Sequence, residues 1–572
     1  MAETLLSPGV LARENDLSAI TAQPIQAGAA IIGPTVKGPV GIPTLVTSYS
    51  QYANLFGTTF MSASVPQSFL TSTSAYNYFQ NGGTTLLVTR IVSGSFTSAT
   101  STNISGSGVA VATSFALKTF GQGTIMNSSG SEVDGALVSG SADNLRWEVS
   151  GFSTSSGTFT LLLRQGNDNS EQKTVLESYT NLSLDPTAPN YISKVIGDIY
   201  QTINTSDTTP YVQTNGTYPN RSRYVYVSSV NAKTPNYFDN NGNFKSEYTA
   251  SLPAVASGSF DGATGQVYFE TAGAAFNENI NSATNIQGLN NTNYTTSIAL
   301  LANQDEYIFN AITAPGLTIE NTPTTVTSLI NMVQERGDAI AIVDPSAYGA
   351  TLNGMTAEAS SYNSSYAACY APWLQTTSPE TGELVWVPAS TMIPGVYAYN
   401  DRVGEAWFAP AGLNRGGLAT VVRPERKLSQ SERDTLYQGK VNPIASFPGS
   451  GVVVFGQKTL QTKASALDRV NVRRLLINLK RFIGGQANNL VFEQNTIATR
   501  NRFLSAVNPY LDSVVQREGL YAYRVVMDDT NNTADVIDRN QLVGQIYIQP
   551  TKTAEFIVLD FVVQPTGASF GA

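Results

Sequence analysis

Two places where a helix is followed directly by a continuous apolar strand constrain the fold of this chain most. In the first, a helical pattern over 74–80 stops at Asn81-Gly82-Gly83, and the strand 85–92 follows. In the second, a helix is expected over 326–336, and the strand 339–345 comes next. Strands without polar alternation are typical of sheets that helices cover on both faces, with right-handed crossovers. The two units therefore predict an α/β core.

The region between these two units, 94–299, has a different character. Charged residues become scarce, and runs of Ser, Thr, Gly and Asn separate short β-rich segments such as 159–164 and 224–227. Such segments bounded by turn residues are typical of strands. We predict a mainly β insertion of one or two domains. A decorative surface domain explains this pattern as well as a functional domain does.

The C-terminal part has the pattern of a compact α+β domain with exposed strand edges. A helix over about 466–483 has an apolar stripe at i, i+3, i+4, i+7 spacing, and basic residues flank it. A second helix over about 500–516 follows. Strands are expected over 521–528, 542–550 and 554–563.

A chain of 572 residues exceeds what one hydrophobic core supports, so several domains are expected. The predicted fold class is multidomain α/β and α+β, with an inserted β region and terminal strands exchanged between copies. The predicted divisions are an N-terminal arm 1–22, a core part 23–93, the inserted outer region 94–299, a second core part 300–440, a C-terminal domain 441–552 and a terminal strand 553–572.

The composition excludes several kinds of chemistry. The chain contains no histidine, which removes Ser-His-Asp and Cys-His nucleophiles, His-ligated zinc and the usual general base. Its single cysteine, Cys369, lies among aromatic residues and is interpreted as a core thiol. A net charge of −9 argues against a nucleic-acid partner. No apolar stretch approaches the ~20 residues that cross a membrane, and no signal peptide is expected.

Four stretches come close to functional motifs, but each lacks a residue that the chemistry requires. Residues 451–459 resemble a phosphate loop, but Gln457 separates the glycine from the lysine. Residues 239–243 lack the acidic first ligand of a calcium loop and are interpreted as a turn. Asp344 ends a strand without a base beside it, and Asp401 with Glu405 is interpreted as a solvated turn pair. We therefore predict no catalytic residue, no cofactor and no metal site.

One stretch, 404–416, combines the aromatic pair Trp407-Phe408 with a Pro and Gly turn, which predicts a rigid corner. Asn471-Val472-Arg473-Arg474-Leu475-Leu476 follows and opens the first C-terminal helix. In this order near the C-terminus, the two motifs resemble the contractile tail sheath proteins of myophages and related injection machines. The resemblance is strongest from about 300 onward and over 24–92.

This resemblance implies a structural subunit and not an enzyme. Sheath subunits form stacked hexameric rings around a tail tube, and the sleeve contracts to drive the tube through the host envelope for genome ejection. The implied partners are further copies of the chain, the tail tube protein, and baseplate and tail terminator proteins. The implied location is the virion tail, after synthesis in the host cytoplasm.

The resemblance also implies roles for particular residues. The N-terminal arm and the last strand would pair with neighbouring subunits through apolar side chains, which are Leu5, Leu6, Val10, Leu11, Phe556, Val558, Phe561 and Val563. The basic residues of the first C-terminal helix would face the tube, and these are Arg473, Arg474, Lys480 and Arg481. The alternative for this helix is a merely solvated basic face.

Two other functions remain open at this point. A surface adhesin or tail-fibre-type binding module would explain the Ser/Thr/Asn-rich β region and predicts slender trimers. An α/β enzyme with carboxylate chemistry predicts a pocket in which an acid of raised pKa lies beside a second carboxylate.

Overall fold

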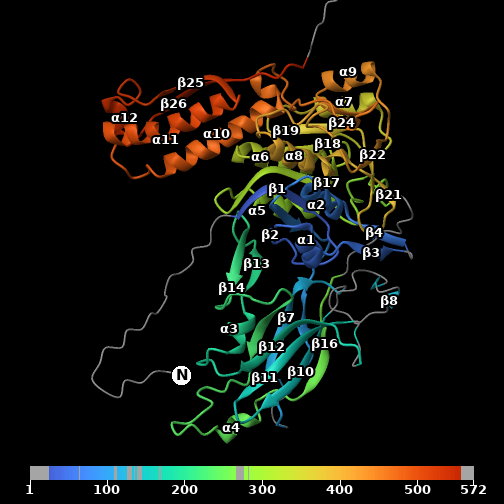
Figure 1. The fold of residues 1–572 in the computed structure, drawn as a ribbon, viewed down its shortest axis with the longest axis vertical. Coiled ribbons are helices and arrows are strands. Elements are labelled where there is room, and N and C mark those ends of the chain that lie inside the picture. The colour runs from blue at the N-terminus through green and yellow to red at the C-terminus, as the bar shows by residue number, and fades with distance from the viewer. Residues whose placement is uncertain are drawn as a thin grey trace, which may run out of the picture.

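The computed structural model describes residues 25–62, 65–108, 113–124, 132–133, 136–137, 145–166, 168, 171–265, 276–280 and 282–555. Figure 1 shows an elongated molecule with the outer β domain at the bottom and the α/β core above it, and the helical C-terminal subdomain extends to the left beside the upper part of the core. The predicted arm residues Leu5, Leu6, Val10, Leu11, Phe556, Val558, Phe561 and Val563 lie outside the described residues.

The core is an eight-stranded sheet in the order β2-β5-β1-β17-β18-β19-β23-β24. Its six inner strands are parallel, and the two edge strands run antiparallel to their neighbours. The strands are β1 Ile25–Gly33, β2 Thr44–Val46, β5 Leu86–Arg90, β17 Tyr307–Thr318, β18 Ile340–Asp344, β19 Ala367–Ala371, β23 Val441–Phe447 and β24 Gly451–Val454. Because β1 pairs with β17 across the insertion, the predicted α/β core made of two sequence segments is confirmed.

Both faces of this sheet are buried, as the continuous apolar strands predicted. Ala29 and Ile31 of β1 pack with helices α1 and α2, whereas Ala30 and Ile32 belong to the cluster that contains helix α6. Helix α1 begins after the Ser48 cap and ends at Gly57, whose φ is 69°. The core helices are α1 Tyr49–Phe56, α2 Leu70–Gln80, α5 Thr295–Leu300, α6 Pro323–Arg336, α7 Leu352–Ser360, α8 Ile393–Val403 and α9 Gln430–Gln438.

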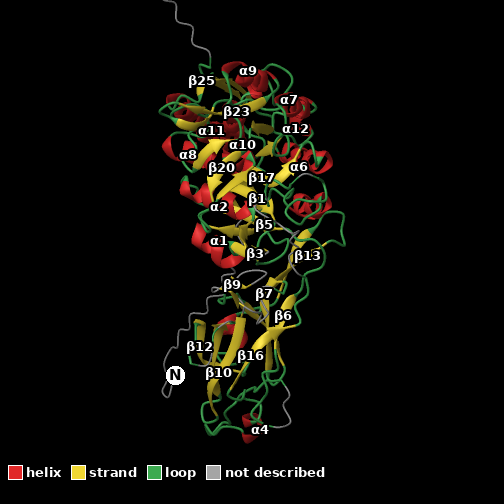
Figure 2. Ribbon diagram, turned by 90° about the vertical axis from the view of Figure 1, so that its right-hand side faces the viewer, coloured by secondary structure: helices red, strands yellow, loops and turns green. Residues whose placement is uncertain are grey.

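The insertion forms a seven-stranded antiparallel sheet in the order β12-β11-β10-β16-β6-β7-β15, which confirms a mainly β region. Figure 2 shows this sheet separate from the core sheet. Its strands are β6 Ser98–Ser101, β7 Phe115–Gln122, β10 Leu145–Ser153, β11 Thr158–Gln165, β12 Val175–Ser183, β15 Val225–Val230 and β16 Ala256–Asp261. Buried and half-buried residues alternate along β7, so one face carries the domain's own core.

Smaller elements complete the core and the outer domain. The outer domain also contains the hairpin β13 Tyr200–Asn204 with β14 Tyr211–Asn215, β8 Glu132–Val133, β9 Ala136–Leu137, α3 Ile192–Ile196 and α4 Ser246–Thr249. The core also contains β3 Thr59–Ser62, β4 Val65–Ser68, β20 Leu374–Thr377, β21 Leu384–Val387 and β22 Val421–Pro424.

The C-terminal subdomain consists of α10 Val470–Asn488, α11 Ile497–Gln516, β25 Leu520–Val526, α12 Ala534–Asp538 and β26 Gln545–Pro550. Two long helices and a two-stranded sheet match the predicted α+β arrangement. Helix α10 begins and ends later than expected, because Arg469 has an extended backbone and the helix continues through Gly484 and Gly485.

Two predicted domain boundaries are wrong. The division at 440/441 cuts the core, because β23 and β24 pair into the core sheet and the C-terminal subdomain begins at α10. The division at 299/300 is late, because Ile280, Ile286 and Leu289 already belong to the core cluster. Both errors have the same cause: long-range pairing and packing decide which sheet or core a segment joins, and local pattern does not report it.

Candidate assembly site at the C-terminal subdomain

The rigid corner at 404–416 holds the C-terminal subdomain on the core. Trp407 is buried and packs with Leu475 and Leu479 of α10. Its indole N–H donates to the backbone carbonyl of Arg517 at 3.0 Å, and the Arg517 guanidinium lies 5.0 Å from the ring centre. The corner therefore contacts one helix on its apolar stripe and the other at its C-terminal end.

Two ion pairs connect the same surfaces. Arg474 of α10 lies 2.5 Å from Asp401, and its guanidinium is 4.6 Å from the centre of the Tyr397 ring. Arg517 lies 2.8 Å from Glu405. The interpretation of Asp401 and Glu405 as a solvated turn pair is wrong, because each carboxylate meets an arginine of the C-terminal subdomain.

Two further arginines of α10 make contacts with other parts of the same chain. Arg473 is buried, its guanidinium lies 4.0 Å from the centre of the Tyr366 ring, and burial lowers its pKa. Arg481 is half-buried and donates to the backbone carbonyls of Phe309 and Asp338, each at 3.1 Å. Arginine suits these positions because its planar guanidinium stacks on rings and donates to several acceptors at once.

The basic face of α10 is therefore not a solvated one. Arg473 and Arg474 are 4% and 5% exposed, so they have no free surface to offer a partner in this conformation. Lys480 is exposed, and its ammonium lies 3.1 Å from the Tyr366 hydroxyl. The tube contact stays a prediction, and Lys480 is the residue of this set that remains accessible for it.

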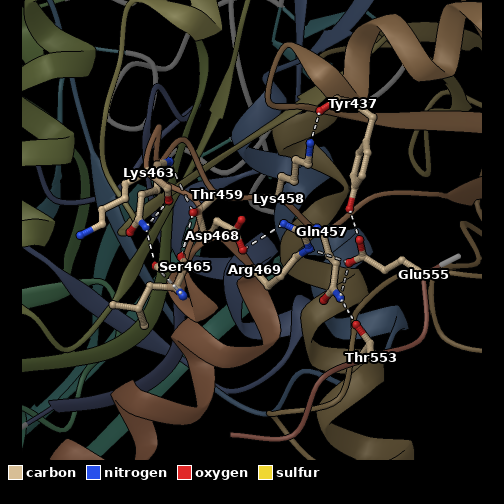
Figure 3. A network of polar contacts seen from close by, with 12 residues as sticks. Tyr437, Gln457, Lys458, Thr459, Lys463, Ser465, Asp468, Arg469, Thr553 and Glu555 are labelled. Carbon is tan, nitrogen blue, oxygen red and sulfur yellow. Dashed lines mark hydrogen bonds and ion pairs between the residues drawn. The ribbon is translucent and has the colours of Figure 1, made fainter.

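A second cluster anchors the chain just before residue 556 (Figure 3). The Glu555 carboxylate accepts hydrogen bonds from the Tyr437 hydroxyl at 2.7 Å, Gln457 Nε2 at 3.0 Å and Arg469 Nε at 2.8 Å. Gln457 Nε2 also donates to Thr553 Oγ1 at 2.7 Å. Burial acts to raise the pKa of Glu555, but these donors outweigh it and hold the pKa below its usual value.

This cluster explains the near-match to a phosphate loop. Lys458 donates to the Tyr437 carbonyl at 2.8 Å and lies 4.2 Å from the centre of that tyrosine ring, so it does not fold over a phosphate cradle. The loop is the turn that was predicted, although its strand already ends at Val454. The sequence contains no pattern that predicts the Glu555 cluster, because its residues lie up to 118 positions apart along the chain.

A groove of about 370 Å³ lies beside this cluster. The rigid corner supplies Ala409 and Ala411, and Pro443, Phe455 and Thr553 are among the other residues that line it. Phe455 is 44% exposed, so the groove presents an aromatic side chain to solvent.

The sheet formed by β25 and β26 is open. The two strands pair antiparallel with each other, and neither has another strand partner among the described residues. One face packs on α11, whereas Tyr521 and Tyr547 are 66% and 56% exposed. Unpaired strand edges of this kind accept an additional strand through main-chain hydrogen bonds.

The sites considered for chemistry do not form a catalytic constellation. Asp344 is 1% exposed, and its carboxylate accepts from Ser390 N at 2.9 Å and Ser390 Oγ at 2.5 Å. Cys369 is buried, as predicted. Asp239 accepts the N–H groups of Asn241 and Asn243, which confirms a turn. Within the described ranges no metal-ligating cluster of three or more His, Cys, Asp or Glu occurs, and no helix there is both long and apolar enough to span a bilayer.

The buried Asp344 predicts a pH dependence of stability. Burial raises its pKa from 3.8 to about 7, against the opposing effect of its Ser390 hydrogen bonds. The folded state then holds a proton that the unfolded state has lost, so this group makes the unfolding free energy fall as pH rises from about 4 to about 7. We expect Asp344→Asn to remove this slope, at most about 1.4 kcal/mol per pH unit, in denaturant titrations at several pH values. Identical pH profiles for both proteins would show that folding does not shift the pKa of Asp344.

The helix-covered core, the arginine-bonded subdomain and the two-stranded β25–β26 sheet define a multidomain α/β and α+β protein. Comparisons with known proteins show which family the second half of the chain is similar to. Residues 287–460 match the phage tail sheath protein central domain, and residues 462–564 match the phage tail sheath C-terminal domain. Over these residues the chain matches both domains of the phage tail sheath family, which confirms the resemblance to contractile tail sheath proteins.

Individual relatives agree with this assignment. The chain is 45% identical to the tail sheath protein of Vibrio phage KVP40 and 43% identical to that of Enterobacteria phage T4, each over 185 residues. Each alignment covers 32% of this chain and 28% of the relative, so the matched part spans less than a third of those proteins. The fold is similar to that of the sheath tail protein from Listeria innocua, with a TM-score of 0.53 and 11% identity over 92% of this chain and 95% of that one.

Proposed function

We propose that this chain is the structural subunit of a contractile phage tail sheath. It polymerises as stacked hexameric rings around the tail tube, and contraction of the sleeve drives the tube through the host envelope for genome ejection. It acts without enzymatic chemistry, is made in the host cytoplasm, and resides in the virion together with tube, baseplate and tail terminator proteins.

The observation that carries this proposal is the open sheet of β25 and β26 within a family-matched C-terminal domain. Two free edges accept one strand each. The N-terminal arm and the terminal strand supply these strands to adjacent copies, through Leu5, Leu6, Val10 and Leu11 on one side and Phe556, Val558, Phe561 and Val563 on the other. Main-chain pairing keeps the copies connected while their cores rotate.

The arginine contacts support movement between subunits and not within one. Arg474 with Asp401, Arg517 with Glu405, and the buried Trp407 make the core and the C-terminal subdomain one mechanical unit. Energy for contraction is then stored in contacts between copies. Lys480, exposed on α10, supplies an electrostatic contact with the tube, which would set register more than affinity.

Negative-stain electron microscopy of the purified full chain tests this proposal. We expect striated hollow cylinders. Slender trimers would instead support a surface adhesin or tail-fibre module, and compact particles that do not polymerise would support an enzyme. Either of these two outcomes contradicts the sheath proposal.

A further inference from the structure

The loop between α10 and α11 presents an apolar side chain that the described residues leave uncovered. Phe492 is fully exposed, at 101% of its reference area. Its neighbour Val491 is 58% exposed, and Ile497 at the start of α11 is 64% exposed. Single exposed apolar residues are ordinary, but three of them between 491 and 497 suit a protein contact.

The backbone holds Phe492 outward at a cost. The Glu493 N–H donates to the Leu490 carbonyl at 3.0 Å, which closes a turn with Val491 and Phe492 at its two middle positions. Phe492 has φ 70°, a value that such turns normally give to Gly or Asn. A bulky side chain in this region is strained, and strain of this kind persists where the surroundings impose it and is concentrated at functional sites.

The surroundings do impose it. Leu490 is buried in the core of the C-terminal subdomain. Asn495 donates to the Gln541 carbonyl at 2.8 Å and accepts from Arg500 Nε at 2.9 Å. The tip is therefore anchored on both sides, and Phe492 is presented as a rigid aromatic anchor, the type of residue that dominates binding energy at interfaces.

The groove beside the rigid corner has complementary chemistry. Its volume of about 370 Å³ exceeds the ~150 Å³ that is enough to hold a benzene molecule. Phe455 packs on Phe447 with ring centres 4.8 Å apart, and the Arg433 guanidinium lies 5.3 Å and 5.9 Å from the centres of the Phe447 and Phe455 rings. An incoming phenyl ring would pack against Phe455 and under this guanidinium.

The loop cannot reach the groove of its own chain. The C-terminal end of α11 contacts Trp407, two residues before Ala409 of the groove. The loop lies at the other end of this 20-residue helix, which is about 30 Å long. In Figure 1 the two sites lie on opposite sides of the upper part of the molecule: α12 is on the left, and Gln541, just after it, contacts the loop, whereas α9 on the right lines the groove.

We infer that Phe492 of one copy inserts into the groove of the next copy, lined by Ala409, Ala411 and Phe455. A protrusion and a groove on opposite sides of one subunit give a head-to-tail contact, which closes into a ring or continues as a helix. Glu493 makes only a long ion pair within its own chain, 3.8 Å from Arg502. Its carboxylate could therefore pair with Arg433 of the next copy when Phe492 is inserted. The inference rests on the proposed self-assembly and adds a specific contact to it.

Cysteine cross-linking in assembled sleeves tests the contact directly. The native Cys369 is 0% exposed, so introduced cysteines react alone. With Phe492→Cys and Ala411→Cys in one chain, a short bis-maleimide should produce a ladder of covalent oligomers. Phe492→Cys with Leu384→Cys, where Leu384 is 56% exposed outside the groove, should stay monomeric. Sleeves that form normally while the first pair also stays monomeric would overturn the inference.

A substitution gives a second readout. Phe492→Asn relieves the strained backbone, so the melting temperature should stay unchanged or rise. The protein concentration needed for sleeve formation should rise at least tenfold. Phe244→Asn, at a 45% exposed phenylalanine of the outer domain, is the control and should assemble like the unmodified chain. Equal assembly of Phe492→Asn would refute the contact, whereas absence of sleeves from the unmodified chain would refute the proposed function itself.

Discussion

Removal of residues 1–20 is expected to leave a folded monomer that no longer forms sleeves. The first core strand begins at Ile25, so the truncation leaves the core sheet intact. The lost segment includes Leu5, Leu6, Val10 and Leu11, the side chains proposed to pair with a neighbour. The expected result is an unchanged melting curve, a monomer in sedimentation, and no cylinders by electron microscopy.

A matched variant separates the apolar side chains from arm length. Replacement of Leu5, Leu6, Val10 and Leu11 by serine keeps the arm but removes its apolar surface, and should reproduce the loss of assembly. Normal polymerisation of the truncated chain would show that the arm does not connect copies.

Arg474→Met is expected to lower the free energy of unfolding by about 3 kcal/mol, since it leaves the Asp401 carboxylate without its partner. Arg474 is 5% exposed on its side chain and Asp401 is 35% exposed, so solvent compensates for part of the loss. Denaturant titration measures the change. Proteolysis within 404–416 should also accelerate, because the C-terminal subdomain separates more easily from the core.

The matched control is Arg502→Met. The Arg502 side chain is 63% exposed and lies 3.8 Å from Glu493, so its loss should change stability by less than about 0.5 kcal/mol. The double variant Arg474→Met with Asp401→Asn removes both charges and should recover part of the stability. Equal effects at Arg474 and Arg502 would mean that the buried ion pair does not hold the subdomain in place.

Much of the fold followed from local pattern. The strand 339–345 and helix 326–336 correspond to β18 and α6, because a continuous apolar run and a 3.6-residue period each leave a clear signal. The two C-terminal helices and the strands β25 and β26 were predicted for the same reason. The boundaries failed at β23 and β24, whose pattern suits either domain until their partner strands are known.

The candidate site was less accessible from the sequence. The basic residues of α10 stand out in the sequence, but their contacts with Tyr366 and Asp401 join residues that lie 73 to 114 positions apart. No sequence pattern distinguishes Phe492, because its exposure and its positive φ are properties of a folded turn. The Glu555 cluster could not be predicted either, because it joins residues that are distant along the chain.

The amino-acid order by itself determined the helix-covered core, the β insertion, the open-edged C-terminal subdomain, and the lack of histidine chemistry, since periodicity, turn residues and composition act locally. The tertiary structure alone decided which arginines are buried, where the domains divide, and which groove and which aromatic tip remain uncovered. These features arise from contacts between residues far apart in the chain, and burial of a charge or a ring has a defined free energy only once those neighbours are in place.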